Sequence, residues 1–314
     1  MKISGFSFVR DGVSLYYPVA ESIRSILPIC DEFVVAVGQG SAGDRTREVI
    51  EEINDPKVKI IDTVWNEKDF QHGAINARQT DIAMQACAGD WLFYLQADEV
   101  VHEKYLPVIH ARLEELLHDL EVEGLLFSYK HFWGDYLHYI ESHSWYSREI
   151  RIVRNVPQIH SWHSAQSFRY YDRYEHPWQK DGTRKLRAAV VDAEVFHYGW
   201  VRPPQLMQKK NKALFLLHRG AKSAEEAFRQ APAEFSYGDL SKLPVYRDTH
   251  PAVMAGMISR MNWADRLAVQ PKRWFHSSSF KHETLKDKAI TWVEKHLHGG
   301  EQLFRRKNYV LVNR

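Results

Sequence analysis

The residues best suited to chemistry in this sequence are the acidic pair Asp98 and Glu99. They follow Trp91–Leu95, a run of aromatic residues and Leu that is typical of a strand buried on both faces of a largely parallel sheet. Ligands of open α/β sheets bind just beyond the carboxyl ends of the strands. A carboxylate placed there can hold a divalent cation, which can in turn hold a phosphate. The alternative is that both acids cap a following helix, where the macrodipole favours negative charge.

The elements that must position this pair alternate between strand and helix through the first hundred residues. Short apolar runs predict strands at 3–9, 33–37, 58–62 and 91–95, and apolar residues at helical spacing predict helices at about 15–27, 44–53 and 73–88. This order requires a parallel sheet with right-handed crossovers. Further along, we expect a helix from Glu99 to Leu117, strands at 124–129, 149–154 and 190–196, and helices at 203–218 and 289–297.

Composition narrows the class of protein. The chain has 314 residues, 44% of them hydrophobic and 26% charged, which is ordinary for a globular protein with a substantial core. A net charge of +2 gives no case for a nucleic-acid surface. Because the sequence contains neither a long apolar run nor a signal-peptide pattern, we expect a cytoplasmic protein. Cys30 and Cys87 lie in apolar segments without a CxxC partner, so we expect buried thiols.

A glycine-rich loop offers a different function. Gly38–Gly43 follows a predicted strand and has the GxGxxG spacing of dinucleotide-binding loops, with Asp62 at the end of the next strand, where a ribose-binding acid is expected. This pattern predicts, as an alternative, an NAD(P)-dependent oxidoreductase. Against it, the helix is predicted to begin only at Asp44, whose carboxylate would face the phosphates. A structural turn explains the glycines equally well.

Segments spread over residues 2–210 resemble, in the same order, the family 2 glycosyltransferases, which have the GT-A fold. The most specific is GDWLFYLQADE at 89–99, which matches the family's GDWILFLDADE. Residues 31–46 are similar to its DE-strand-GSTDGT segment, and GAINARQT at 73–80 resembles its G-x-x-x-AR-N helix start. FHYGW at 196–200 resembles the late segment that carries a histidine.

The resemblance implies an α/β, GT-A-like fold, in which a mostly parallel, twisted sheet is flanked by helices. Residues 1–202 would form the catalytic domain, with a nucleotide-binding half at 1–129 and a mixed acceptor half at 130–202. Residues 203–314 would form a helical C-terminal extension.

The same resemblance implies a metal-dependent, inverting glycosyltransferase of the hexosyltransferase type. It would move a sugar from a UDP- or GDP-linked donor to a glycan or lipid-linked glycan, with Mn²⁺ or Mg²⁺ as cofactor. Asp98 would be the first metal ligand and His197 the second. Gln96 replaces the first acid of the family's Asp-x-Asp and brings no charge, so a non-catalytic nucleotide-binding module is a further alternative. The implied nucleotide contacts are Phe8, Arg10, Gly38, Asp62, Arg78, which would face the diphosphate, Gln96 and Asp98.

Inverting transfer also needs a general base on the acceptor side. Six residues could serve: Asp135, Glu141, Glu149, His160, His163 and Asp172. The position that follows the strand resembling 148–154 in related enzymes points to His163, whose imidazole titrates near neutrality.

For one set of aromatic residues and one set of basic residues, the sequence allows either a binding role or a purely structural one. Five aromatic residues of the acceptor half could stack on sugar or pack in the core: Trp133, Trp145, Tyr146, Trp162 and Trp178. In the C-terminal third, Lys209–Lys210 and Arg305–Lys307, with Trp274 and Phe275, could make peripheral contact with an anionic membrane. A solvated helix face explains the same charges.

Overall fold

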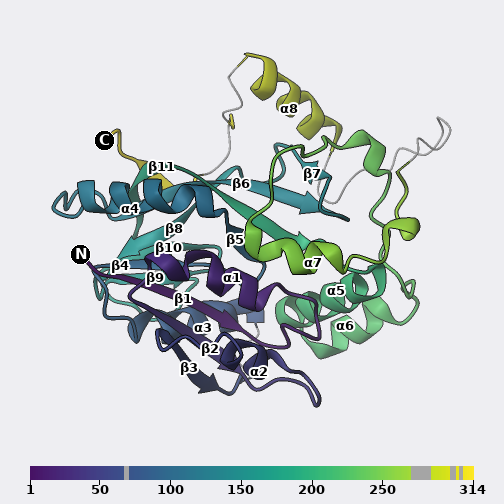
Figure 1. The fold of residues 1–314 in the computed structure, drawn as a ribbon, viewed down its shortest axis with the longest axis horizontal. Helices are drawn as coiled ribbons and strands as arrows, with labels where there is room; N and C mark the ends of the chain where they lie inside the picture. Colours follow the sequence, from purple (N-terminus) through teal and green to yellow (C-terminus); the bar gives the residue numbers. More distant parts are fainter. Residues whose placement is uncertain (67–70, 270–283, 298–301, 304–306) are drawn as a thin grey trace.

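The structure is a computed structural model that describes residues 1–66, 71–269, 284–297, 302–303 and 307–314. Its largest feature is one twisted sheet of strand order β3-β2-β1-β4-β8-β6-β11-β10-β9, with helices on both faces (Figure 1).

The first half of this sheet is parallel, as the alternating sequence predicts. It contains β1 (Ile3–Val9), β2 (Glu32–Gly38), β3 (Val58–Thr63) and β4 (Trp91–Tyr94). The crossovers are α1 (Val19–Ile26) with the short η1 (Leu27–Ile29), α2 (Thr46–Glu51), and η3 (Gln71–Gly73) with α3 (Ala74–Gln85). The carboxyl ends of β1 and β4 therefore meet at one edge of the sheet.

The second half of the sheet is mixed. β8 (Arg148–Arg154) lies between β4 and β6 (Gly124–Trp133) and is antiparallel to both. The long β11 (Thr183–Trp200) runs parallel to β6. The antiparallel strands β10 (Ser167–Tyr171) and β9 (Ile159–Trp162) complete the edge, and β7 (Tyr139–Ile140) pairs with β6.

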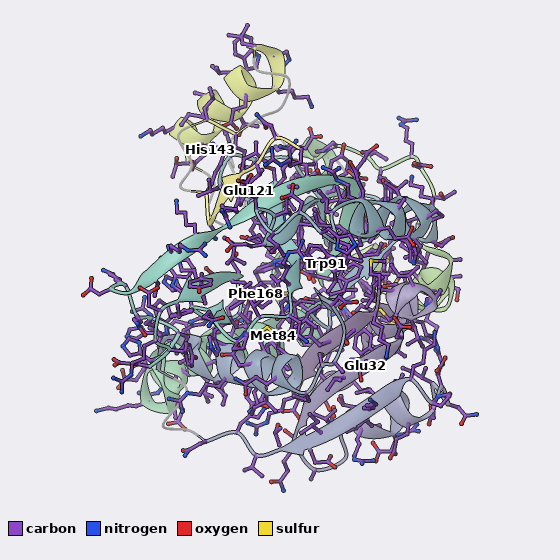
Figure 2. The ribbon with its side chains drawn as sticks, turned by 90° about the vertical axis from the view of Figure 1, so that its left-hand side faces the viewer. Glu32, Met84, Trp91, Glu121, His143 and Phe168 are labelled. Carbon is purple, nitrogen blue, oxygen red and sulfur yellow. The ribbon has the colours of Figure 1, made fainter. Side chains whose placement is uncertain are left out.

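β4 is buried on both faces, which confirms the prediction made from its apolar run. Trp91 and Phe93 pack with the cluster beneath α1 and α4 (Leu106–Glu115), whereas Leu92 and Tyr94 pack on the α3 side with Met84. Figure 2 shows Trp91, Met84 and Phe168 in the interior of the molecule. Cys30 and Cys87 are buried free thiols, as expected.

The region after β4 differs from the prediction. In place of a helix that begins at Glu99, the chain forms β5 (Glu99–Val101), then η4 (Glu103–Tyr105), and only then α4. The carboxylate of Glu99 accepts two hydrogen bonds from the Arg151 guanidinium, both 2.8 Å long, and both side chains are fully buried. Glu99 is therefore a strand residue in a buried ion pair, and the helix-capping alternative is wrong for it.

The C-terminal part is only partly helical. It contains α5 (Pro204–Arg219), α6 (Ala221–Phe228), η5 (Leu240–Lys242), η6 (Ala252–Met254), α7 (Ala255–Ser259), η7 (Ala264–Arg266), α8 (Leu285–Leu297) and β12 (Tyr309–Leu311). β12 returns to the large sheet and pairs with β11. The domain boundary at residue 202 stays a prediction. Among the described residues, no helix is long and apolar enough to cross a membrane.

Candidate active site

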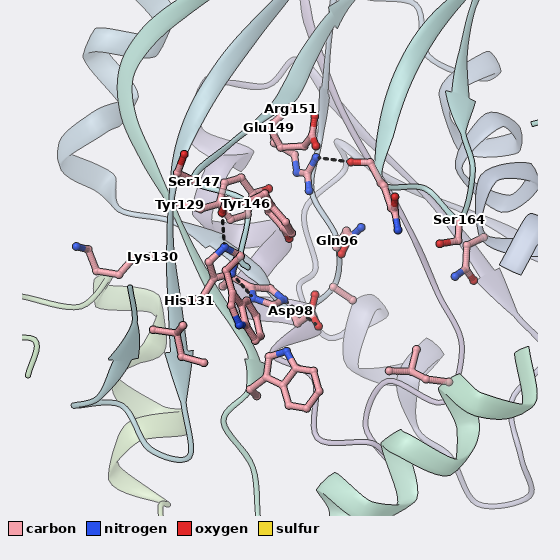
Figure 3. Close-up of a pocket in the computed structure, with 18 of the residues that line it drawn as sticks. Gln96, Asp98, Tyr129, Lys130, His131, Tyr146, Ser147, Glu149, Arg151 and Ser164 are labelled. Atoms are coloured by element: carbon pink, nitrogen blue, oxygen red, sulfur yellow. Dashed lines mark hydrogen bonds and ion pairs between the residues drawn. The ribbon is translucent and has the colours of Figure 1, made fainter. Parts of the chain in front are cut away.

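A cavity of about 1250 Å³ lies at the carboxyl ends of β1 and β4. Its lining includes Arg10 after β1, Asp98 after β4, His131 on β6 and His197 on β11, together with Lys210 on α5. Figure 3 shows Asp98 and His131 gathered in one part of this cavity, and Glu149 and Arg151 in another. The cavity is thus at the place where the sequence predicts a ligand, around Asp98.

Strand register brings three of these side chains together. β5 is antiparallel to β11, which places Glu99 opposite His197, and β11 is parallel to β6, which places His197 opposite His131. The backbone N–H of Tyr198 donates to the carbonyl of Asp98 at 2.8 Å and fixes the turn that carries the carboxylate. As a result, Nε2 of His197 lies 3.7 Å from Oδ2 of Asp98.

The two histidines form a chain that orients His197. Nε2 of His131 lies 2.7 Å from the carbonyl oxygen of Tyr146, and Nδ1 of His131 lies 3.0 Å from Nδ1 of His197. Because a carbonyl only accepts, neutral His131 donates from Nε2 and accepts at Nδ1 from His197. This tautomer leaves the lone pair of His197 on Nε2, the nitrogen that faces Asp98. An imidazole held through its other nitrogen is typical of a metal ligand.

Lys210 is the cation closest to this carboxylate. Its Nζ lies 3.0 Å from Oδ2 of Asp98 and 2.7 Å from the carbonyl oxygen of Gly199. Burial alone would raise the pKa of Asp98, but the positive charges of the Lys210 ammonium and, to a smaller extent, the Arg202 guanidinium outweigh burial and hold that pKa well below its ordinary value. Lys210 is 5% exposed, so the prediction that places it on a membrane-facing patch is wrong.

The rest of that proposed patch is described only in part. Lys209 and Lys307 are exposed. Trp274, Phe275, Arg305 and Arg306 lie outside the described residues. Peripheral membrane contact therefore stays a prediction.

The residues around Asp98 fit a divalent cation that arrives with a phosphate ligand. Asp98 and His197 offer a carboxylate oxygen and an imidazole nitrogen, and among the described residues no group of three or more His, Cys, Asp or Glu could hold a metal ion. Such cations often bind through one or two side chains, with substrate phosphates and water completing the shell. Gly199 keeps the two donors accessible, because an added Cβ would lie 2.5 Å from His197 Nε2 and 2.6 Å from Asp98 Oδ2.

The other predicted nucleotide contacts do not all lie in the same place in the structure. Phe8, Arg10 and Gln96 line the cavity, and the amide of Gln96 donates to the carbonyl of Ala165 at 3.0 Å. Gly38 and Asp62 line a separate pocket of about 420 Å³. Arg78 is exposed on α3 and is not among the described residues that line either space. Its contact with the diphosphate stays a prediction without support from its position.

Carboxylates within the protein lie against the glycine-rich loop and accept hydrogen bonds from N–H groups in and around it. The Ser41 N–H donates to Asp11 at 2.6 Å, and Asp44 accepts from the N–H groups of Ser14 and Thr46. α2 begins at Thr46, after the third glycine. Two carboxylates thus lie beside this loop, and their negative charge disfavours a pyrophosphate there.

Four of the six general-base candidates are not among the described residues that line the cavity. His163 is stacked against Trp162 and Trp178, with ring centroids 3.5 and 3.9 Å apart, and is not among the described residues that line the cavity. Burial and nearby cations lower its pKa to about 4. The carboxylate of Asp135 accepts a hydrogen bond from the His138 ring, and His160 pairs with the carboxylate of Asp81. Asp172 is exposed.

Only Glu141 and Glu149, of the six, line the cavity. Glu141 is exposed and pairs with Lys295. Glu149 is buried and accepts from the Ser167 hydroxyl at 2.8 Å and from the Asn308 amide at 3.2 Å. Burial raises the pKa of Glu149. Of the five aromatic candidates, Trp145 and Tyr146 line the cavity, whereas Trp133 is buried in the core.

Comparison with known proteins agrees with this geometry. Residues 18–175, half of the chain, match the model for glycosyl transferase family 2. The chain therefore belongs to family 2 of the glycosyltransferases, which confirms the expected family. Its twisted sheet, parallel in the first half and flanked by helices, confirms the expected fold class.

Several solved structures are similar at low sequence identity. One is TarS of S. aureus in complex with UDP, 19% identical over 42% of this chain and 36% of that chain, with a TM-score of 0.30. A second TarS structure is 14% identical over 72% of this chain and 42% of that chain, with a TM-score of 0.41. Glucosyl-3-phosphoglycerate synthase from Mycobacterium tuberculosis, in complex with Mn²⁺, UDP and glucosyl-3-phosphoglycerate, is 16% identical over 41% of this chain and 44% of that chain, with a TM-score of 0.29. The alignments span less than half the length of these relatives. No curated protein matches the chain.

Proposed function

We propose that this protein transfers a sugar, of the hexose type, from a UDP- or GDP-linked donor to an acceptor hydroxyl. The observation that carries the proposal is the buried carboxylate of Asp98, which faces the cavity just beyond β4 with an ammonium 3.0 Å and an imidazole 3.7 Å away. Membership of family 2 supports the same reaction.

Each side chain at the site has a distinct task. The diphosphate leaving group gains negative charge as the glycosidic bond breaks, and fixed positive charge aimed at it accelerates the reaction. Asp98 and His197 would hold a divalent cation, Mg²⁺ or, because imidazole is a ligand, preferably Mn²⁺. When bound, that cation supplies Lewis-acid stabilisation of the leaving diphosphate. His131 keeps the Nε2 lone pair of His197 directed at the site.

For the acceptor side we propose inversion with Glu149 as the general base. It is the one buried acid among the six candidates that also lines the cavity. A raised pKa suits a group that must take a proton from a hydroxyl near neutral pH. Trp145 and Tyr146, in the loop that precedes β8, offer aromatic faces for a glycan or lipid-linked glycan acceptor.

Replacement of Glu149 tests this assignment. We expect Glu149→Gln to lower the turnover rate by about 10²–10⁴-fold without weakening nucleotide binding. Since the base must be ionised and burial raises its pKa, the wild-type rate should fall on acidification at a higher pH than for an ordinary glutamate. This acidic limb should disappear in the variant. Glu141→Gln, at the exposed acid in the same lining, is the matched control, and equal rates in both variants would rule Glu149 out as the base.

Calorimetry with UDP and GDP, each with and without Mn²⁺, tests the proposed function itself. We expect one of the two nucleotides to bind in a metal-dependent manner, and the corresponding sugar nucleotides to release that nucleotide slowly in the presence of enzyme. Affinity for NAD(P) in place of either nucleotide would overturn the proposal. Nucleotide binding without hydrolysis, and without transfer to any member of an acceptor library, would indicate a non-catalytic module.

A further inference from the structure

We propose that Lys210 is a mobile counter-ion that pairs with Asp98 in the empty enzyme and moves to the donor diphosphate when a divalent cation binds Asp98. This inference rests on the proposed function, because it names a residue that would contact the leaving group. Lys210 lies on α5, outside residues 18–175, so the family match does not assign it a role.

The surroundings of Lys210 hold its ammonium at the cavity wall. Nζ bonds the Asp98 carboxylate and the carbonyl of Gly199, and lies 4.8 Å from the centre of the Tyr17 ring. Arg202, the other buried cation nearby, is fixed in a different way, because its guanidinium donates to the backbone carbonyls of Leu15 and Gly199. Arg202 is not among the described residues that line the cavity, whereas Lys210 is. Of these two cations, Lys210 is therefore the one in reach of a ligand.

Lys210 and a divalent cation would compete for the same carboxylate oxygen of Asp98. Oδ2 of Asp98 is the atom bonded by Lys210, and it is also the atom that lies 3.7 Å from Nε2 of His197. A divalent cation held between Asp98 and His197 would place three positive charges, counting the ammonium, around this single oxygen. Repulsion between like charges at such distances disfavours simultaneous occupancy. The ammonium must then leave Oδ2 when the cation binds.

The diphosphate is the natural new partner for the displaced ammonium. Lysine carries a compact charge on a flexible side chain and binds phosphate as a point charge. Its ammonium can therefore move along the cavity wall from the carboxylate to a phosphate. The exchange keeps the buried ammonium paired in both states. It also couples the two ligands: the cation binds weakly to the empty enzyme, where it competes with Lys210, and tightly once a diphosphate receives that ammonium.

Lys210→Met separates the effect of Lys210 on cation binding from its effect on nucleotide binding. The matched control is Lys209→Met, at the exposed neighbour on the same helix. Mn²⁺ binding to the nucleotide-free protein is measured from the electron paramagnetic resonance signal of free Mn²⁺. We expect Lys210→Met to bind Mn²⁺ roughly tenfold more tightly than wild type, because the competing ammonium is gone. In calorimetry at saturating Mn²⁺, the same variant should bind UDP or GDP, whichever wild type prefers, about 10- to 100-fold more weakly, the usual effect of one charge-assisted hydrogen bond.

The outcomes distinguish the inference from the function on which it rests. If wild type binds neither nucleotide, the proposed function fails. If wild type binds one and Lys210→Met binds it equally well, or binds Mn²⁺ no more tightly than wild type, only the exchange is overturned. Thermal melting of each variant reports on folding, and Lys210→Gln provides the same two comparisons should the methionine variant fail to fold.

Discussion

Asp98→Asn is expected to lower the rate of sugar transfer by about 10³-fold or more while the fold persists. The substitution preserves the shape of the side chain but removes the negative charge on which the cation site depends. Loss of a single electrostatic contact to the transition state commonly costs about 10²–10³ in rate, and here a ligand of the cation is lost. The measurement is the release of UDP or GDP from the donor that wild type uses, at saturating Mn²⁺.

Stability must be separated from catalysis in this variant. The pKa of Asp98 is depressed in the folded protein, so its ionised form stabilises the fold above the pKa of the unfolded chain, and this contribution is lost as the pH falls through the folded value. Asn forfeits that contribution at neutral pH and leaves Lys210 without its carboxylate. The double variant Asp98→Asn with Lys210→Met should regain much of the stability and none of the activity. Transfer by Asp98→Asn within tenfold of wild type would contradict the role given to Asp98.

Arg151→Met is expected to reduce the free energy of unfolding by about 3–5 kcal/mol, the usual cost of breaking a buried ion pair from one side. The methionine can still pack between the rings of Tyr94 and Tyr129, over which the guanidinium now lies. It leaves the Glu99 carboxylate buried, with the Tyr129 hydroxyl at 2.8 Å and the backbone N–H of Gln96 at 3.0 Å as its remaining partners. Chemical denaturation of both proteins provides the comparison.

A surface pair serves as the control for this prediction. Arg47 pairs with Asp62 at 3.0 Å, but both side chains are largely exposed, so Arg47→Met should change stability far less. If Arg151→Met unfolds at the same denaturant concentration as Arg47→Met, the buried pair does not hold the turn before β5. Because Gln96 and Asp98 belong to that turn, we also expect the Arg151 variant to bind the nucleotide less tightly.

Local sequence pattern was sufficient to predict the parallel half of the sheet. The run from Trp91 to Leu95 consists of aromatic residues and Leu, without a charged side chain, and such a run is typical of a strand buried on both faces, as β4 is. The abrupt change to acid after it located Asp98 at the edge of the cavity. Both inferences depend on residues adjacent in sequence, which is why they could be drawn without a structure.

The remainder of the site depends on contacts between residues far apart in the chain. His131 meets His197 because β6 and β11 pair in one particular register, which no short motif specifies. Glu99 looked like the start of a helix, and its pairing with Arg151, on β8, explains why it lies in a strand. Lys210 resembled one half of a basic surface pair until α5 was seen to turn it inward. His163 was predicted as the base from the position of that residue in related enzymes, but it lies against the indole rings of Trp162 and Trp178.

A crystal structure of the protein with UDP or GDP and Mn²⁺ would test the central claim most directly. We predict metal density on Asp98 and His197, the diphosphate beside it, and the Lys210 ammonium turned from Asp98 toward the phosphates. Nucleotide density at Gly38–Gly43, with the Asp98–Lys210 pair intact and no ligand beside it, would contradict the account.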